Sequence, residues 1–177
     1  MTTDTTPTIR PRTPEDLPAC AEALAAVHRH DGYPLDWPAD PGGWLARASG
    51  LGAWVVELDG RLAGHVSLAP GGDGDLAPAL WHTPATAVVS RLFVTPQARG
   101  HCLGTLLLDR AAAESRRLRL HPLLDVLTTD TAATALYEHL GWARLATTEQ
   151  HWGPSRTVTI HSYAAPNPPE EPFHAFE

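Results

Sequence analysis

The sequence predicts an α/β protein built around a mixed β-sheet with helices on both faces. Patterns typical of strands and of helices alternate in the second half of the chain, and this alternation favours a sheet that is covered on both sides. An Asp-Gly pair between two β-rich runs predicts a hairpin in the first half. With 177 residues, 43% of them apolar and 19% charged, the chain has the size and composition of one soluble globular domain.

The first part of the chain predicts a strand over residues 8–12 and then a helix that runs to about residue 30. Thr13 is a favourable N-cap for this helix. The segment 31–52 is rich in proline, glycine, aspartate and large aromatic residues, which indicates an ordered surface loop with a short helix after Pro41.

The remaining elements follow from apolar periodicity and from the turn residues between the apolar runs. We expect a hairpin of 53–58 and 61–69, a Gly/Pro-rich connection over 70–86, a strand over 87–94, a loop over 95–101, a helix over 102–119, a strand over 122–127, a helix over 131–140, and two last strands over 142–148 and 156–163.

The domain is expected to span residues 8–164, with a polar tail over 1–7 and a Pro/Glu-rich tail over 165–177. No apolar run resembles a signal peptide or reaches membrane-spanning length. The net charge of −7 makes nucleic acid and anionic membranes unfavourable partners. Cys20 and Cys102 fall in a predicted helix and a predicted loop, so they are expected to be free thiols. Together these features predict a cytoplasmic protein.

The most informative segment is a strand, a glycine-bearing loop and a helix over residues 89–117. The unpaired N–H groups and the positive dipole end of the helix converge on the loop, which is a suitable site for a pyrophosphate. The loop lacks the Gly-Lys-Ser/Thr of a P-loop and the third glycine of a dinucleotide fingerprint. On spacing alone, a tight strand–helix turn is the alternative.

The distribution of charge is compatible with an anionic cofactor in this region. The first half of the chain is acidic, whereas arginines gather in the middle, at Arg91, Arg99, Arg110, Arg116, Arg117 and Arg119. The alternative is that these arginines only solvate the exposed face of a helix.

Two motifs resemble those of the GNAT superfamily of N-acetyltransferases. The run VTPQARGHCLG over 94–104, followed by TLLL, resembles motif A, in which a Val-x-Pro strand end leads through a Gln/Arg-x-x-Gly-x-Gly/Ala loop to a Leu-rich helix. The run DTAATALYEHLGW over 130–142 resembles motif B, Asn-x-x-Ala-x-x-Leu-Tyr with a Gly-aromatic ending. The resemblance covers residues 8–163 in the order of elements and is strong over 88–142.

The resemblance implies the GNAT fold, with a mixed, mostly antiparallel sheet, and an enzyme that transfers the acetyl group of acetyl-CoA to the amine of a small molecule by direct attack in a ternary complex. It implies that the backbone of Leu92 and Val94 pairs with the pantetheine amides, and that Tyr137 is the general acid for the leaving thiolate. The residues implied at the cofactor are Leu92, Phe93, Val94, Arg99, Gly100, His101, Cys102, Leu103, Gly104, Thr105, Asp130, Ala133 and Tyr137.

Three residues depart from the family pattern. Cys102 replaces the usual Gly or Ala, Asp130 replaces Asn, and Val88 stands where many members carry a catalytic Glu. These departures favour one alternative, a catalytically silent sensor that binds acyl-CoA. A second alternative is an enzyme for another acyl group, such as propionyl or succinyl, with Arg91 as the arginine that would bind a dicarboxylic chain. A third is a partner-binding domain that uses the acidic tail.

Proton transfer has several candidates. Tyr137 is the expected acid, although an aromatic residue on an amphipathic helix is also typical of a core position. His65 and Ser67 alternate onto one face of the third strand, and His65 is the candidate base, with His82 as an alternative. No metal site is expected, because the two neighbouring histidines of the first helix point to different faces.

The acceptor is expected to lie against the segment 31–52, where acids and aromatic rings gather. Such a set suits a cationic amine through charge pairing and cation–π contact. The alternative is a proline-braced loop whose Trp side chains fill the core. The substrate-binding candidates are Tyr33, Asp36, Trp37 and Trp81, with Asp31, Asp40 and Trp44 beside them. A peptide N-terminus is also open as the acceptor, and the resemblance allows a homodimer.

Overall fold

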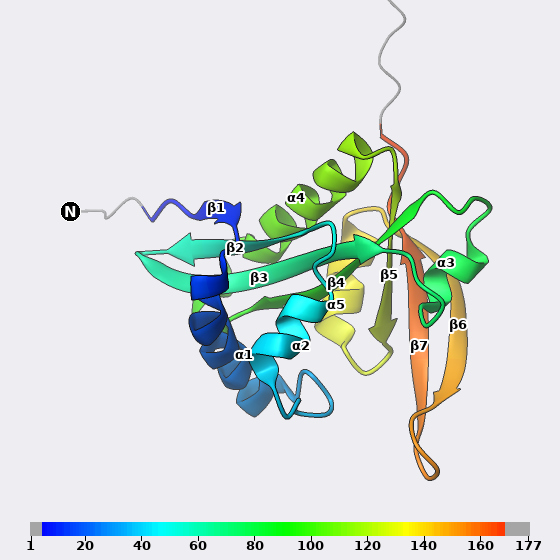
Figure 1. The fold of residues 1–177 in the computed structure, drawn as a ribbon, viewed down its shortest axis with the longest axis horizontal. Helices are drawn as coiled ribbons and strands as arrows, with labels where there is room; N and C mark the ends of the chain where they lie inside the picture. Colours follow the sequence, from blue (N-terminus) through cyan, green and yellow to red (C-terminus); the bar gives the residue numbers. More distant parts are fainter. Residues whose placement is uncertain (1–4, 169–177) are drawn as a thin grey trace, which may run out of the picture.

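A computed structural model describes residues 5–168 as a seven-stranded sheet with helices on both faces (Figure 1). The elements are β1 (Thr8–Pro11), the 3-10 turn η1 (Pro14–Asp16), α1 (Leu17–Asp31), α2 (Pro41–Arg47), β2 (Gly52–Leu58), β3 (Arg61–Pro70), α3 (Leu76–Leu80), β4 (Thr86–Val94), the 3-10 turn η2 (Pro96–Ala98), α4 (Leu103–Arg117), β5 (His121–Leu127), α5 (Thr131–His139), β6 (Ala143–His151) and β7 (Thr157–Ala164).

The strands lie in the order β1-β2-β3-β4-β5-β7-β6. All neighbouring strands are antiparallel except β4 and β5, which are parallel. The predicted fold class, a mixed and mostly antiparallel sheet with helices on both faces, is confirmed.

Each face of the sheet packs against its own helices. Leu24 of α1 and Leu45 of α2 are fully buried against one face. On the opposite face, Leu107 and Leu108 of α4 are fully buried in the larger apolar cluster, which also receives Tyr137 of α5. No helix within residues 5–168 is both long enough and apolar enough to cross a bilayer.

The strand β4 carries a bulge in its second half. Its register with β3 shifts between the pairs His65–Phe93 and Ser67–Ser90, so β4 has one extra residue there. Arg91 lies in this bulge with a left-handed φ of 51°. A β-bulge bends its strand, and β4 departs from regular pairing just before its C-terminal end.

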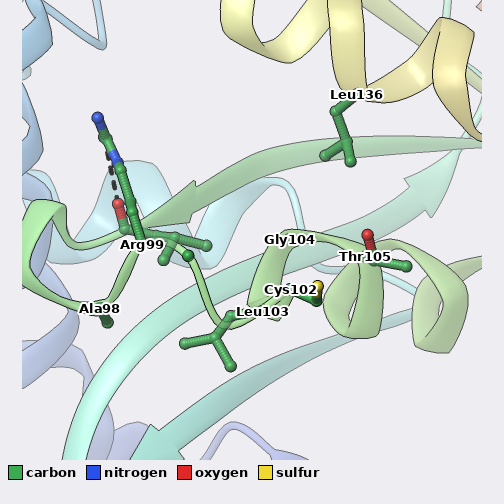
Figure 2. A pocket seen from close by; sticks show the side chains of 9 residues that line it. Ala98, Arg99, Cys102, Leu103, Gly104, Thr105 and Leu136 are labelled. Carbon is green, nitrogen blue, oxygen red and sulfur yellow. Dashed lines mark hydrogen bonds between the residues drawn. The ribbon is translucent and has the colours of Figure 1, made fainter.

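A tight loop joins β4 to α4 and is the segment in which motif A was found (Figure 2). Gly100 has φ 87° and Cys102 has φ 57°, so two residues of the loop are left-handed. Glycine adopts this conformation without a Cβ clash, whereas cysteine does not. The loop therefore has the sharp turn that the motif predicts, with one unfavourable residue in it.

The structure differs from the sequence prediction in the connection before β4, where α3 forms inside the expected loop 70–86. The carboxylate of Asp125 in β5 accepts hydrogen bonds from the backbone N–H groups of Leu76 and Ala77, at 2.9 and 3.1 Å. These bonds satisfy N–H groups that a helix leaves unpaired at its start. The short helix thus depends on a residue far along the chain, which local patterns do not show.

The chain continues to pack on the domain just after β7 ends at Ala164. Ala165 is buried and donates its N–H to Pro122 at 3.0 Å, while Arg116 donates to the carbonyl of Pro166 at 2.9 Å. The first residues of the expected C-terminal tail are therefore packed on the domain. The rest of the tails, residues 1–4 and 169–177, lies outside the described residues.

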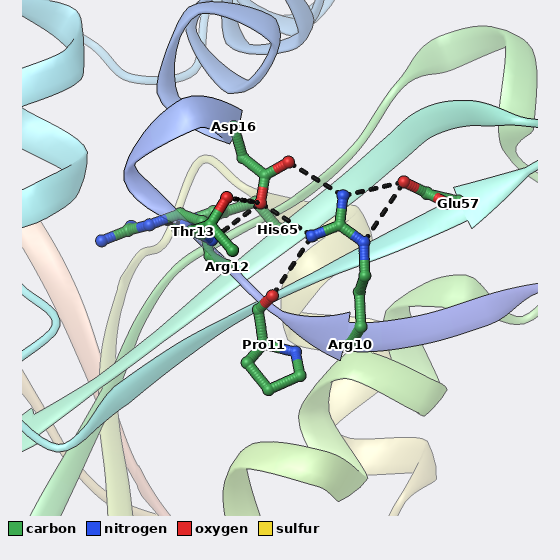
Figure 3. Close-up of polar contacts among 7 residues, drawn as sticks. All are labelled: Arg10, Pro11, Arg12, Thr13, Asp16, Glu57 and His65. Carbon is green, nitrogen blue, oxygen red and sulfur yellow. Dashed lines mark hydrogen bonds and ion pairs between the residues drawn. The ribbon is translucent and has the colours of Figure 1, made fainter.

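A charged network fastens β1 to its neighbours (Figure 3). Arg10 donates two hydrogen bonds of 2.8 Å to Asp16 and one of 2.8 Å to Glu57 in β2. Asp16 also accepts from the backbone N–H of Thr13 at 2.7 Å. The hydrogen bonds from Arg10 hold the pKa of Asp16 well below its usual range.

We predict that Asp16→Asn lowers the free energy of unfolding by about 1 kcal/mol at neutral pH, because the network is partly exposed to solvent and screened. The folded pKa of Asp16 lies below its unfolded value, so its contribution is complete above roughly pH 4 and is lost as the pH falls towards the folded pKa. Urea unfolding from pH 7 down to pH 2 measures both effects. The control is Asp59→Asn in the exposed turn between β2 and β3, and an acid-induced loss in Asp16→Asn as large as in the wild type would contradict the prediction.

Candidate functional site

The candidate site begins where β4 and β5 separate. The two parallel strands pair only over Thr86–Val88 in β4 and His121–Leu123 in β5, and Figure 1 shows them diverging beyond these residues. β4 continues to Val94. Among residues 5–168, its C-terminal half has no strand partner on the side that faces away from β3.

The backbone of β4 presents hydrogen-bonding groups to this opening. Thr95 donates its N–H to β3 at 2.8 Å, and backbone groups alternate between the two edges of a strand. Phe93 therefore faces β3, whereas the N–H and C=O groups of Leu92 and Val94 face the opening. An extended molecule that contains amides can pair with these groups as an added strand would.

A pocket of about 160 Å³ lies at the start of α4, at the end of β4 (Figure 2). Gly104 allows α4 and α5 to approach closely here, because a Cβ at this position would lie 3.2 Å from Leu136. The pocket is lined by Val94, Ala98, Arg99, Gly100, Cys102, Leu103, Gly104, Thr105 and Leu136.

The pocket has the chemistry of an anion site. The 15-residue helix α4 starts at Leu103, and the side chain of Cys102 does not cap it. The N–H groups of the first turn and the positive end of the helix dipole therefore point to the pocket without a side chain competing for them. The Nδ1 atom of His101 lies 3.1 Å from the carbonyl oxygen of Ala98, so this side chain contacts the loop itself.

Arg99 lines the same pocket, but its guanidinium pairs with Asp31 at the end of α1. Two hydrogen bonds join the side chains, one of them 3.2 Å long, and Arg99 also donates to the carbonyl of Val94 at 3.4 Å. This pairing lowers the pKa of Asp31 to about 2. A bound pyrophosphate would have to share Arg99 with Asp31.

Tyr137 lies on α5 with its ring in the core, 5.8 Å from the ring of Tyr163 and 6.1 Å from that of Trp142. Burial raises the pKa of its phenol, and the nearby ionisable groups of Tyr33 and Asp130 raise it further. A raised pKa keeps the phenol protonated but makes it a weaker acid, so the shift by itself does not favour the role of proton donor. The role depends on the position of the phenol in the motif.

Asp130 is the N-cap of α5. Its carboxylate accepts the N–H of Ala133 at 3.2 Å, which satisfies one of the unpaired groups at the start of the helix. Burial raises its pKa. Aspartate is a good N-cap, so the change from the family's usual Asn keeps this local role.

His65 is fully buried, and both of its ring nitrogens are engaged. Nδ1 donates to the carbonyl of Arg91 at 2.9 Å, and Nε2 accepts from Arg12 at 2.9 Å (Figure 3). The ring stacks on Phe93 with centroids 5.3 Å apart, and burial lowers the pKa of His65 to about 4. A histidine whose lone pair is occupied by a guanidinium is a poor proton acceptor, so this geometry argues against the expected role as a base. Val88, which stands where many family members carry a catalytic Glu, is buried and apolar.

The acidic residues in the loop before α2 bind other groups of the protein. Asp36 pairs with Arg156, which lies between β6 and β7, and one of their hydrogen bonds is 3.0 Å long. Asp40 caps α2 by accepting the N–H of Gly43 at 3.0 Å. Trp37 is 41% exposed and lies against His28, with ring centroids 5.2 Å apart.

Trp81 lies away from the opening. Its ring stacks on His121, the first residue of β5, with centroids 4.3 Å apart. Since Thr86 pairs with His121, this is the closed end of the β4–β5 pair. The structure thus separates Trp81 from Tyr33, Asp36 and the other residues proposed for the acceptor.

Leu136 and Arg156 were not recognised from the sequence. Leu136 lies one position before the motif tyrosine, and the family pattern itself marks a leucine there, so this signal was available. Arg156 meets Asp36 across 120 residues of sequence, and no local pattern announces such a pair. Among residues 5–168, no three His, Cys, Asp or Glu side chains gather in a way that could hold a metal ion.

Solved structures with the same fold include the Salmonella typhimurium protein yncA, which was solved with its cofactor acetyl-CoA. It is 22% identical to this chain, with a TM-score of 0.65 over 89% of this chain and 92% of its own. The ribosomal-protein-S18-alanine N-acetyltransferase of Escherichia coli is 18% identical, with a TM-score of 0.68 over 97% of this chain and 100% of its own. The ribosomal-protein-alanine N-acetyltransferase of Brucella melitensis is 22% identical, with a TM-score of 0.65 over 88% and 98%.

At these identities the likeness shows the fold. No curated protein matches the chain. The sequence model described as the Acetyltransferase (GNAT) family matches residues 17–142, which include both motifs and the whole opening between β4 and β5. The chain therefore belongs to the GNAT family of acetyltransferases, for which acetyl-CoA is the cosubstrate.

Proposed function

We propose that this enzyme transfers the acetyl group of acetyl-CoA to the amine of a small molecule, by direct attack of the amine on the thioester in a ternary complex. The observation that carries the proposal is the opening between β4 and β5, with the backbone of Leu92 and Val94 on one side and the start of α4 at its end. The pantetheine arm would pair with the strand, and the pyrophosphate would bind the first turn of α4.

In this arrangement a free backbone N–H of β4 polarises the thioester carbonyl, and the negative charge that develops on its oxygen is stabilised by a fixed dipole. The amine forms the new C–N bond, and the C–S bond breaks. Tyr137 then gives its proton to the departing thiolate, the nitrogen loses a proton to solvent water, and solvent returns a proton to the Tyr137 phenolate.

An ion pair between two segments beside the candidate site favours a small acceptor. The pair of Asp36 and Arg156 connects the loop before α2 to the β6–β7 hairpin. Tyr33, in the same loop as Asp36, lies close enough to Tyr137 to affect its pKa. A loop fastened to this hairpin is expected to leave less room for a folded protein than for a small amine.

Cys102 is the departure that bears most directly on the pyrophosphate loop. Its φ of 57° is left-handed, and this conformation costs a non-glycine residue roughly 1–2 kcal/mol. Cys102 nevertheless adopts the left-handed conformation in which a glycine would be unstrained. The substitution is therefore expected to cost stability rather than to remove the anion site.

We predict that Tyr137→Phe lowers kcat roughly 100-fold or more, which is the usual contribution of a positioned acid. The affinity for acetyl-CoA should change little, because the ring stays in the core. Thiol release across a panel of amines measures turnover, and calorimetry measures binding of acetyl-CoA.

The matched control is Tyr163→Phe, which removes a phenol that donates to Glu138 at 2.8 Å instead of facing the site. This variant should keep the wild-type kcat. If Tyr137→Phe kept it too, Tyr137 would not be the proton donor, and if no amine gave thiol release, the proposed function itself would be wrong.

We also predict that Cys102→Gly is more stable than Cys102→Ala by about 1 kcal/mol, because alanine keeps the left-handed strain and glycine removes it. Thermal unfolding of the two variants, which have the same missing thiol, measures the difference. Equal stability of the two would show that the loop carries no such strain.

A further inference from the structure

Arg91 is a cation that the mechanism above does not use. It lies in the bulge of β4, and its guanidinium covers the ring of Trp44 in α2, 4.0 Å from the ring centroid. This contact places the side chain on the face of the sheet that α1 and α2 cover, beside the loop that carries Tyr33.

The guanidinium of Arg91 has no carboxylate bound to it among the residues that the structure describes. Its Nε is buried without a hydrogen-bond partner, and it forms no ion pair there. Burial lowers the pKa of Arg91 and the positive charge of Arg47 lowers it further, whereas Tyr33 and the carboxylate of Asp75, which forms no ion pair with Arg91, act in the opposite direction. A half-buried cation that has a like charge nearby and no carboxylate bound to it is unfavourable unless a ligand supplies the anion.

The acids of the neighbouring loop do not fill this role. Asp31 pairs with Arg99, Asp36 pairs with Arg156, and Asp40 caps α2. Each of these carboxylates therefore already has a partner in the structure, whereas the guanidinium of Arg91 has no carboxylate bound to it.

Arg91 also lies close to the reacting groups. The ring centroids of Tyr33 and Trp44 lie 6.4 Å apart, so Arg91 and Tyr33 contact the same tryptophan, and the charge of Tyr33 influences the pKa of both Arg91 and Tyr137. Ser67, opposite Ser90 in the register of β3 and β4, has a buried hydroxyl without a partner among the described residues. Two unsatisfied polar side chains thus lie on one side of the bulge, and both can donate to an anionic oxygen.

We propose that Arg91, assisted by Arg47, binds a carboxylate carried by the acceptor, so that the substrate is an amino acid or a similar amine acid. This inference rests on the proposed function. The acceptor is the favoured source of the carboxylate because Tyr33, Trp44 and Arg47 belong to the segment 31–52, which is expected to contact the acceptor, and because the acetyl group itself carries no charge. The planar guanidinium suits a carboxylate, to which it donates two parallel hydrogen bonds.

The first arm of the test compares amino acids with their carboxamides as acceptors for the wild-type enzyme, with acetyl-CoA as donor. The carboxamide has the less basic amine, so chemistry without recognition would favour it. We expect the acids to have the higher kcat/KM, roughly tenfold or more, which is the usual contribution of a hydrogen bond to a charged group.

The second arm uses Arg91→Gln, because glutamine at φ 51° carries the same backbone strain as arginine. This variant should lose the preference for acids, keep its rate with carboxamides, and bind acetyl-CoA as the wild type does. Arg91→Lys should restore only part of the preference, because lysine lacks the planar fork. Arg47→Gln gives a smaller loss and serves as a second variant, and Arg61→Gln at the exposed start of β3 is the control.

Equal use of acids and carboxamides by the wild type would overturn this inference and leave the proposed function standing. The inference would also be overturned if Arg91→Gln lowered kcat/KM by the same factor for the amino acids and for their carboxamides. A preference for a dicarboxylic acyl-CoA with neutral amines would assign the carboxylate to the acyl chain and would also overturn it. No thiol release with any amine would overturn the proposed function, and this inference with it.

Discussion

β4 parts from β5 after three residue pairs, and the other features of the site depend on this separation. Continued pairing would occupy the backbone groups of Leu92 and Val94 and would leave no edge for an amide-containing cofactor. The bulge at Arg91 bends β4 just before this edge. The same edge leads to the loop before α4, so that one strand supplies both the partner for an extended chain and the approach to the anion site.

The helices place the remaining groups around this edge by packing. α4 and α5 approach closely because Gly104 has no side chain, and this approach brings Leu136 to the pocket at the start of α4. The Tyr137 ring is held in the core between two other aromatic rings. The proton donor that we propose would therefore lose little entropy when the cofactor binds, which is the advantage of building a site on rigid elements. The loop before α2 is held instead by ion pairs at Asp31 and Asp36, which salt screens.

Most of the fold was predictable because its signals are local: the Asp-Gly turn, the proline and glycine boundaries, and the motif around residues 94–104. The helix α3 was not predictable, since the carboxylate that satisfies its first N–H groups belongs to β5. The sequence suggested His65 as a base because no local pattern shows that Arg12 occupies its Nε2 in the structure. The sequence alone does not show that Asp31 and Asp36 pair with arginines, because these partners lie 68 and 120 residues away in the chain.

The most direct test of this account follows the backbone amides of β4 by NMR hydrogen exchange, with and without acetyl-CoA, in the full chain. The account predicts that the N–H groups of Leu92 and Val94 become protected when acetyl-CoA binds, together with those of the first turn of α4. The N–H of Phe93 faces β3 and should change little. Binding of acetyl-CoA that leaves Leu92 and Val94 unprotected would contradict the assignment of the opening between β4 and β5 as the cofactor site.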